Sequence, residues 1–339
     1  MRTRNPVFDI MKGVGIILML IGHIPPGDRL FHFIYSFHMP LFFIVAGVFA
    51  KTEKIGLEAL KKNASRLLLP VLVTMLFIII LAPLHYITDH NFNYTIAQIL
   101  SLLWAGDAIR SRFGVISLDS MWFLVALFWA KCIFQLIGHL VTQYRNKYQD
   151  ELVLVVCIAI SASAVYLHKI IPFVPFGFLK GMSAIVFIAF GWYLNRKHLP
   201  IYIYIVFVLS WFLALRLGAI DMYRYYYRFY PLDILGAIGA TGIVYLLSKA
   251  IDKYAHRVGV LFQWFGVNSL LILCVNTIDR RTFLVRAIKN ALGIHPIGLY
   301  NTLFSYFVEF LLVALIIAIP FLRKIYKAIG IKEICCCAN

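Results

Sequence analysis

Apolar runs long enough to cross a lipid bilayer recur along the whole of this chain. A helix needs about 20 consecutive apolar residues to span the hydrocarbon core, and no stretch of soluble-domain size separates one run from the next. Of the 339 residues, 62% are hydrophobic and 14% are charged, unlike a soluble domain. The sequence therefore predicts one integral-membrane domain over residues 1–339. The expected spans lie near residues 6–24, 34–50, 67–87, 121–141, 151–168, 178–194, 200–216, 231–249, 260–278 and 300–320.

These spans are expected to be helices rather than strands. A bilayer core leaves no partner for open backbone groups, and barrel strands would alternate apolar and polar residues, whereas these runs are continuously apolar. The predicted fold class is all-α, a polytopic membrane helical bundle of about ten transmembrane helices.

The net charge of +17 is interpreted through the membrane. Most basic residues lie between apolar runs, where they set topology and contact anionic lipid, so we expect membrane lipid and no nucleic acid as a partner. The basic loop at 51–66 is the strongest indication of orientation. It predicts an integral protein of the cell (inner) membrane with both termini cytoplasmic.

The cysteines indicate neither a disulfide framework nor a metal site. Cys132, Cys157 and Cys274 fall inside apolar runs, as packing residues do. The terminal cluster of Cys335, Cys336 and Cys337 leaves lipidation open, although it does not form a prenylation box. No zinc-ligand spacing is present, so we expect no metal.

The first span carries three ionisable residues, Asp9, Lys12 and His23. Such groups are costly inside a membrane and therefore prompt a functional question. Lys12 and His23 are eleven positions apart, so on a helix they share a face at a separation of roughly 16 Å along the axis. Asp9 lies one turn before Lys12 and can pair with it. A structural ion pair with an interfacial histidine is the alternative interpretation.

The second span opens with Ser36 and His38, near the expected end of the first span. Two histidines and a hydroxyl can therefore meet at one mouth of the bundle. A polar helix start with Pro40 in its first turn is the alternative interpretation. Glu309 is the one acidic residue in the last span and is expected to pair with an interior cation.

Five sequence blocks, in order, make the chain resemble the acyltransferase 3 family of membrane enzymes. Lys12, ten intervening residues and His23 match the family's opening helix, with Lys where Arg is commoner. The other blocks are Ser36 to Gly47 (F-x-M-P-L-F-F-x-x-x-G), Arg66 to Pro70 (R-L-L-x-P), Ser120 to Leu124 (x-x-W-F-L) and Phe265 to Leu270 (G-x-x-S-L). Together they cover about residues 6–278.

The resemblance implies transfer of an acyl group from acyl-CoA, with acetyl-CoA the expected donor, to a hydroxyl of a cell-surface carbohydrate or its lipid-linked precursor. His23 is the expected general base, because an imidazole titrates near neutral pH, and a covalent acyl-imidazole is the less favoured alternative. Lys12 and Asp9 complete the expected catalytic group, in which Lys12, paired with Asp9, would hold the site's geometry or face the acyl donor. The expected CoA-binding residues are Arg66, Lys62 and Lys61, with a role in topology alone as the alternative. The expected acceptor-binding residues are Ser36, His38, Asp119, Trp122 and Asn276. Ser36, His38 and Asn276 could also stabilise the oxyanion, and an interfacial anchor is the alternative for Trp122.

Two other functions stay open at this point. A polysaccharide or small-molecule transporter or exporter also suits about ten spans with interior charges, although no inverted repeat is visible. A member of the family without catalytic activity is the third possibility. Asn276 stands near a position where the family often has histidine, and an asparagine side chain cannot titrate.

Overall fold

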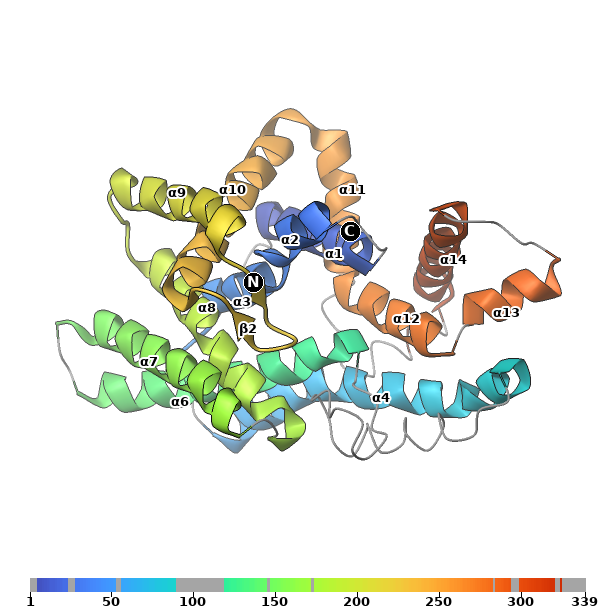
Figure 1. The fold of residues 1–339 in the computed structure, drawn as a ribbon, viewed down its shortest axis with the longest axis horizontal. Coiled ribbons are helices and arrows are strands. Elements are labelled where there is room, and N and C mark those ends of the chain that lie inside the picture. Colours follow the sequence, from blue (N-terminus) through green and yellow to red (C-terminus); the bar gives the residue numbers. More distant parts are fainter. Residues whose placement is uncertain are drawn as a thin grey trace. The chain divides into compact units, whose positions relative to one another are not determined.

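The computed structural model describes residues 5–23, 28–52, 56–89, 119–144, 147–171, 174–282, 284–293, 299–320 and 324. The cysteine cluster at 335–337 therefore lies outside the described residues. Within them the chain is helical apart from one short hairpin (Figure 1), which confirms the predicted all-α class.

The long helices follow the expected spans closely. Eight stretches are long and apolar enough to cross a membrane among the residues searched, and a ninth is counted if a bent helix pair forms one span. The helices are α1 (Pro6–His23), α2 (Asp28–Tyr35), α3 (His38–Val48), α4 (Leu57–Asp89), α6 (Trp122–Gln143), α7 (Gln149–Ile170), α8 (Phe178–Arg196), α9 (Ile201–Leu217), α10 (Tyr230–Tyr254), α11 (His256–Val267), α12 (Ser269–Thr282), α13 (Leu284–Ala291) and α14 (Leu299–Ala318).

Two expected spans differ in detail from straight membrane helices. At 17 residues, α9 is shorter than the other spans. The expected span at 260–278 is interrupted at Asn268, where α11 ends and a bend leads into α12. The side-chain amide of Asn268 donates to the carbonyl oxygen of Trp264 at 2.8 Å. A side chain that bonds the backbone in this way competes with helix continuation, which accounts for the break.

The contacts divide the chain into two compact units, which we describe separately. Unit 1 comprises residues 1–63 and 126–269, and unit 2 comprises residues 64–125 and 270–339. In unit 1, α1 packs against α11, α3 against α8, and α9 against α10.

Glycines permit two of these helix crossings in unit 1. A side chain at Gly266 of α11 would overlap the carbonyl oxygen of Asp9, and one at Gly13 of α1 would overlap that of Phe262. In the same way Gly47 of α3 and Gly191 of α8 each face the backbone of the other helix. Small residues let membrane helices approach closely in this manner, so these crossings fix α1 and α3 firmly within unit 1.

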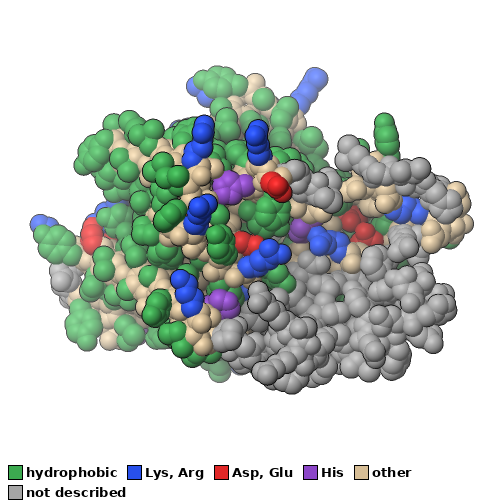
Figure 2. Space-filling model, viewed as in Figure 1, with side chains coloured by type: hydrophobic (Ala, Val, Ile, Leu, Met, Phe, Trp, Pro, Cys, Tyr) green, Lys and Arg blue, Asp and Glu red, His purple; other side chains and the backbone are tan. Residues whose placement is uncertain are grey.

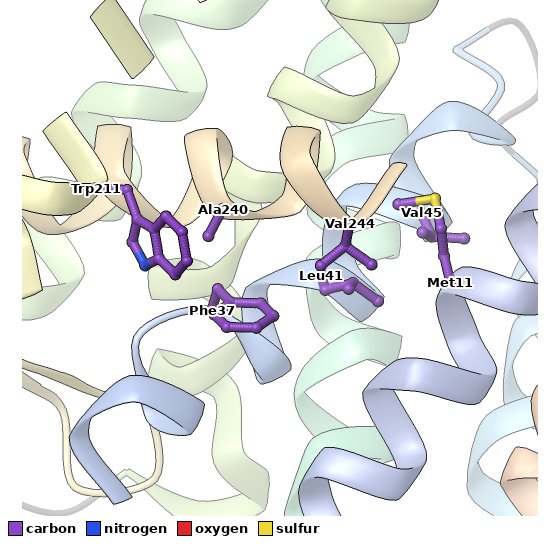
Figure 3. Packing of buried hydrophobic residues seen from close by; sticks show 7 residues of the cluster. All are labelled: Met11, Phe37, Leu41, Val45, Trp211, Ala240 and Val244. Atoms are coloured by element: carbon purple, nitrogen blue, oxygen red, sulfur yellow. The ribbon is translucent and has the colours of Figure 1, made fainter. Parts of the chain in front are cut away.

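A buried apolar cluster joins α1 and α3 to α9 and α10 (Figure 3). Trp211 of α9 lies against Phe37, with ring centroids 5.8 Å apart in an edge-to-face arrangement. The full cluster is Met11, Phe37, Leu41, Val45, Trp211, Ala240 and Val244. The helices that carry the polar residues of the first two spans thus share one core.

A small hairpin connects α9 to α10 in unit 1. Its strands β1 (Ile220–Asp221) and β2 (Tyr226–Tyr227) pair antiparallel. Lys180, in the first turn of α8, is 1% exposed, and its ammonium nitrogen lies 4.8 Å from the ring centre of Tyr223. Burial raises the pKa of Asp221, against the opposing effects of hydrogen bonds from backbone amides and the charge of Arg224.

Hydrophobic side chains cover much of the described surface, including the region over α7 and α9 (Figure 2). On these two helices Val155, Tyr166, Leu209 and Phe212 are all more than half exposed. Exposed apolar patches of this extent mark a membrane or protein contact. Together with the spanning helices they support an integral membrane protein.

Unit 2 contains most of α4, the 3-10 turn η1 (Asp119–Met121) and helices α12, α13 and α14. Lys289 of α13 donates to Asn301 and, at 3.2 Å, to the hydroxyl of Ser305, both in the α14 helix. These bonds tie α13 to α14.

Candidate active site

One continuous helix carries the three polar residues of the first span. Because α1 runs unbroken from Pro6 to His23, Lys12 and His23 share a face and are separated by roughly three turns. The ammonium of Lys12 lies 2.8 Å from the Asp9 carboxylate, as predicted from their spacing. The Asp9 side chain is 7% exposed and that of Lys12 is 24% exposed. This ion pair therefore reaches the edge of unit 1, while Asp9 itself lies within the α1–α11 crossing.

His23 ends α1 and is half-buried. The preceding residue, Gly22, faces the side chains of Ile34 and Tyr35, so the end of α1 packs on the end of α2. Tyr35 in turn meets the ring of His38, with centroids 4.8 Å apart. The structure thus connects the ends of the first two spans through Tyr35. The predicted meeting of His23, His38 and Ser36 at one mouth stays a prediction.

The imidazole of His38 is held in one orientation. It is 4% exposed, and its Nδ1 lies 2.9 Å from the carbonyl oxygen of Ile34. Because a carbonyl can only accept, Nδ1 must carry a proton, which leaves Nε2 as the acceptor of the neutral ring. His38 can therefore accept a hydrogen bond from a hydroxyl at Nε2 while the backbone holds its other nitrogen.

Ser36 has a structural task as well as its predicted one. Its hydroxyl donates to the carbonyl of Phe33 at 2.7 Å and accepts from the indole N–H of Trp211 at 3.0 Å. A hydroxyl has one donor and two acceptor sites, so one acceptor site is left for a ligand. Its role in acceptor binding stays a prediction.

The predicted CoA-binding residues lie on the first turns of α4. Lys61, Lys62 and Arg66 are all exposed there. These three exposed cations lie within the first three turns and suit an anionic ligand such as a phosphate.

A cavity that the sequence did not indicate lies in unit 1 at the C-terminal ends of α3 and α8. Its volume is about 230 Å³. Two cations, Lys51 and Arg196, border it, and Arg196 also pairs with Asp150 at 3.3 Å. Cations at helix C-termini are stabilising on their own account. The lining residues are Val48, Ala50, Lys51, Thr52, Trp192, Asn195 and Arg196.

The remaining predicted residues belong to unit 2. Trp122 is buried at the start of α6, and Asp119 begins η1, although its side chain lies outside the described residues. Asn276 of α12 is 1% exposed, and its amide donates to both carboxylate oxygens of Glu309, at 3.0 and 3.2 Å. The cation beside Glu309 is Arg280, which acts on it electrostatically, and Glu309 also has hydrogen bonds with Asn276 and Asp279.

Within the described ranges, no group of three or more His, Cys, Asp or Glu side chains could hold a metal ion. The polar groups of unit 1 are instead an ion pair, two histidines and exposed cations, which suit proton transfer and the binding of an anion. Among the candidate residues, unit 2 holds the exposed cation Arg66 together with an amide and carboxyl groups.

The fold and these polar groups define a helical integral membrane protein with ionisable residues in its spans. A family model described as an acyltransferase domain matches residues 5–323, nearly the whole chain. The chain belongs to the acyltransferase 3 family, which confirms the resemblance drawn from its sequence blocks. It is therefore a membrane acyltransferase in general terms. No curated protein and no solved structure matches it.

Proposed function

We propose that this protein transfers an acyl group, in the first instance acetyl, from acyl-CoA to a hydroxyl of a cell-surface carbohydrate or its lipid-linked precursor, with His23 as general base. The observation that carries the proposal is the polar face of α1. It holds the Lys12–Asp9 ion pair at one end and His23 at the other, on one unbroken helix.

The chemistry assigns one task to each group. His23 takes the proton of the acceptor hydroxyl as the oxygen attacks the thioester carbon, and the C–S bond breaks as the new ester C–O bond forms. The CoA thiolate then receives a proton and leaves as the thiol. His38 accepts a hydrogen bond from an acceptor hydroxyl at Nε2, since its Nδ1 is already used by Ile34.

The anionic donor needs cations at the membrane surface. CoA carries phosphate groups, for which exposed Lys and Arg side chains are suitable partners. Lys61, Lys62 and Arg66 supply them on the first turns of α4. With the N-terminus cytoplasmic, these residues face the compartment that contains acyl-CoA. We further propose the cell (inner) membrane as the location.

The test is release of free CoA from acetyl-CoA by the protein in lipid nanodiscs. We expect His23→Ala to lower the rate by about 10²–10⁴-fold, as loss of a general base does. His198→Ala is the matched control, because His198 is exposed beyond the end of α8. Equal CoA release by wild type and His23→Ala would overturn the proposal, and glycan movement by both would favour a transporter.

A further inference from the structure

A buried polar group of unit 2 joins α12 to α14. Glu309 is 2% exposed and Asn276 is 1% exposed. The amide nitrogen of Asn276 lies 3.0 and 3.2 Å from the two oxygens of Glu309. A carboxyl group and an amide buried in a membrane domain are costly and mark a functional site by default.

Two carboxyl groups meet at this position. Glu309 and Asp279 are hydrogen-bonded to each other, which requires a proton on one of them. Asp279 also accepts from the backbone N–H of Val285 at 2.7 Å, and the charges of Arg280 and Lys289 act on it. Asp279 therefore has more groups around it that favour its anionic form than Glu309 does.

The described groups around this pair come from three helices. Asp279, Arg280 and Asn276 lie on α12, Lys289 lies on α13, and Tyr306 lies beside Glu309 on α14. The charges of Lys289 and Arg280 therefore offset the negative charge of this acidic group.

The amide oxygen of Asn276 is an unsatisfied polar atom of this group. Donation from Nδ2 to both oxygens of Glu309 fixes the orientation of the amide, so Oδ1 points away from the carboxyl pair. This Oδ1 is buried and accepts no hydrogen bond from any residue that the structure describes. A buried acceptor of this kind needs a donor, and a hydroxyl group supplies one.

We propose that Asn276, Glu309 and Asp279 form a binding site for an uncharged, hydroxyl-bearing ligand, one of whose hydroxyls donates to Oδ1 of Asn276. The carboxyl groups select against phosphates, so this ligand is the neutral acceptor and not the anionic donor. In this respect the inference rests on the proposed function and names the acceptor's class as a neutral polyol or sugar. Asn276 is a binding residue here, and Glu309 and Asp279 are positioning residues.

Glycerol is a suitable probe because it is a small neutral triol. In nanodiscs, with acetyl-CoA as donor, we expect Asn276→Leu to raise the glycerol concentration for half-maximal ester formation at least tenfold. The half-saturating concentration of acetyl-CoA should be measured beside it, so that loss of acceptor binding is separated from loss of donor binding. Asn290→Ala, an exposed asparagine on α13, is the control. An unchanged glycerol dependence in Asn276→Leu would overturn the proposed ligand.

A second measurement needs no turnover. The C=O stretch of a protonated carboxyl in the infrared spectrum should be present in wild type, absent in Glu309→Gln, and shifted by glycerol only while Asn276 is present. Asn276→Asp, which keeps an oxygen at this position, tests the site if Asn276→Leu does not fold. Absence of the band, or a band that glycerol does not shift, would overturn the site.

The two measurements separate the two proposals. If wild type releases no more CoA than His23→Ala, the proposed function fails, and the glycerol-dependent infrared shift alone decides whether the site exists. If CoA release depends on His23 but Asn276→Leu responds to glycerol like wild type, the function stands and the site fails.

Discussion

The crossing of α1 and α11 gives the sharpest prediction about what holds the first-span residues in place. An ideal Cβ at Gly266 would lie 2.7 Å from the carbonyl carbon of Asp9 and 2.9 Å from the backbone nitrogen of Gly13, and it would overlap the carbonyl oxygen of Asp9. All three are backbone atoms, so no side chain can rotate away. Gly266→Ala must therefore push the two helices apart.

The magnitude follows from the cost of overpacking, about 1–3 kcal/mol. Gly242→Ala on α10 is the matched control, because nothing lies within 4 Å of a Cβ there. Both variants gain the same helix propensity, about 0.5–1 kcal/mol, so the difference between them isolates the overlap. We expect Gly266→Ala to be less stable than Gly242→Ala by about 1–3 kcal/mol, and to release CoA more slowly as Asp9 and Lys12 move.

The assay is unfolding of both variants in the same nanodiscs, followed by cysteine accessibility or tryptophan fluorescence, beside CoA release. Equal stability of the two alanine variants would refute the reasoning, because it would mean that α1 and α11 do not approach at Gly266 as the structure has them.

Three further predictions concern individual polar contacts. Lys12→Arg should keep CoA release within about tenfold of wild type, since the cation beside Asp9 is kept. Lys12→Met should lower stability by about 1–3 kcal/mol and reduce CoA release much further. Equal effects of the two substitutions would contradict a role for the Lys12–Asp9 ion pair. Ser36→Ala leaves the Trp211 indole N–H without its acceptor and should lower the free energy of unfolding by about 1–3 kcal/mol. The loss should be smaller in a Trp211→Phe background. A double-mutant cycle with no coupling energy would contradict the hydrogen bond between Ser36 and Trp211. Burial raises the folded-state pKa of Asp221, so folding favours its protonated form. The hairpin should therefore lose stability as pH rises from about 4 through the raised pKa. Faster amide hydrogen exchange at Tyr223 and Arg224 should report this loss. Asp221→Asn should remove that pH dependence, and persistence of it would assign it to another group.

Much of the fold could be predicted because the length and composition of apolar runs identify membrane helices in a sequence. The unbroken α1 and the pairing of Asp9 with Lys12 follow from helical period alone. The family followed from five short blocks. The break at Asn268 was not predicted, since the run through 260–278 is apolar enough to look continuous, and the decisive contact is a side-chain bond to the Trp264 carbonyl.

The polar site of unit 2 was only partly visible in the sequence. Glu309 stood out as a lone acid in an apolar span, which is a reliable signal of function. Its partners are 30 and 33 positions away, at Asp279 and Asn276, and no periodicity connects residues across a change of helix. The sequence could therefore indicate that Glu309 needs a partner but not that the partner would be an amide. In unit 1 the tautomer of His38 was likewise hidden, because it depends on which carbonyl Nδ1 meets.

The two proposed substrates would be bound by sets of residues that differ in their electrostatics. Lys61, Lys62 and Arg66 are exposed cations, which attract the phosphates of a CoA donor and gain nothing from a neutral sugar. The pair formed by Asp279 and Glu309 is buried and negative, so it repels phosphates and tolerates a neutral hydroxyl that can donate to Asn276. If both assignments hold, salt should weaken donor binding, since exposed charges are screened, and leave acceptor binding nearly unchanged. This division would be contradicted if the half-saturating concentration of acetyl-CoA did not change with salt. It would also be contradicted if the half-saturating concentration of glycerol rose with salt as that of acetyl-CoA does.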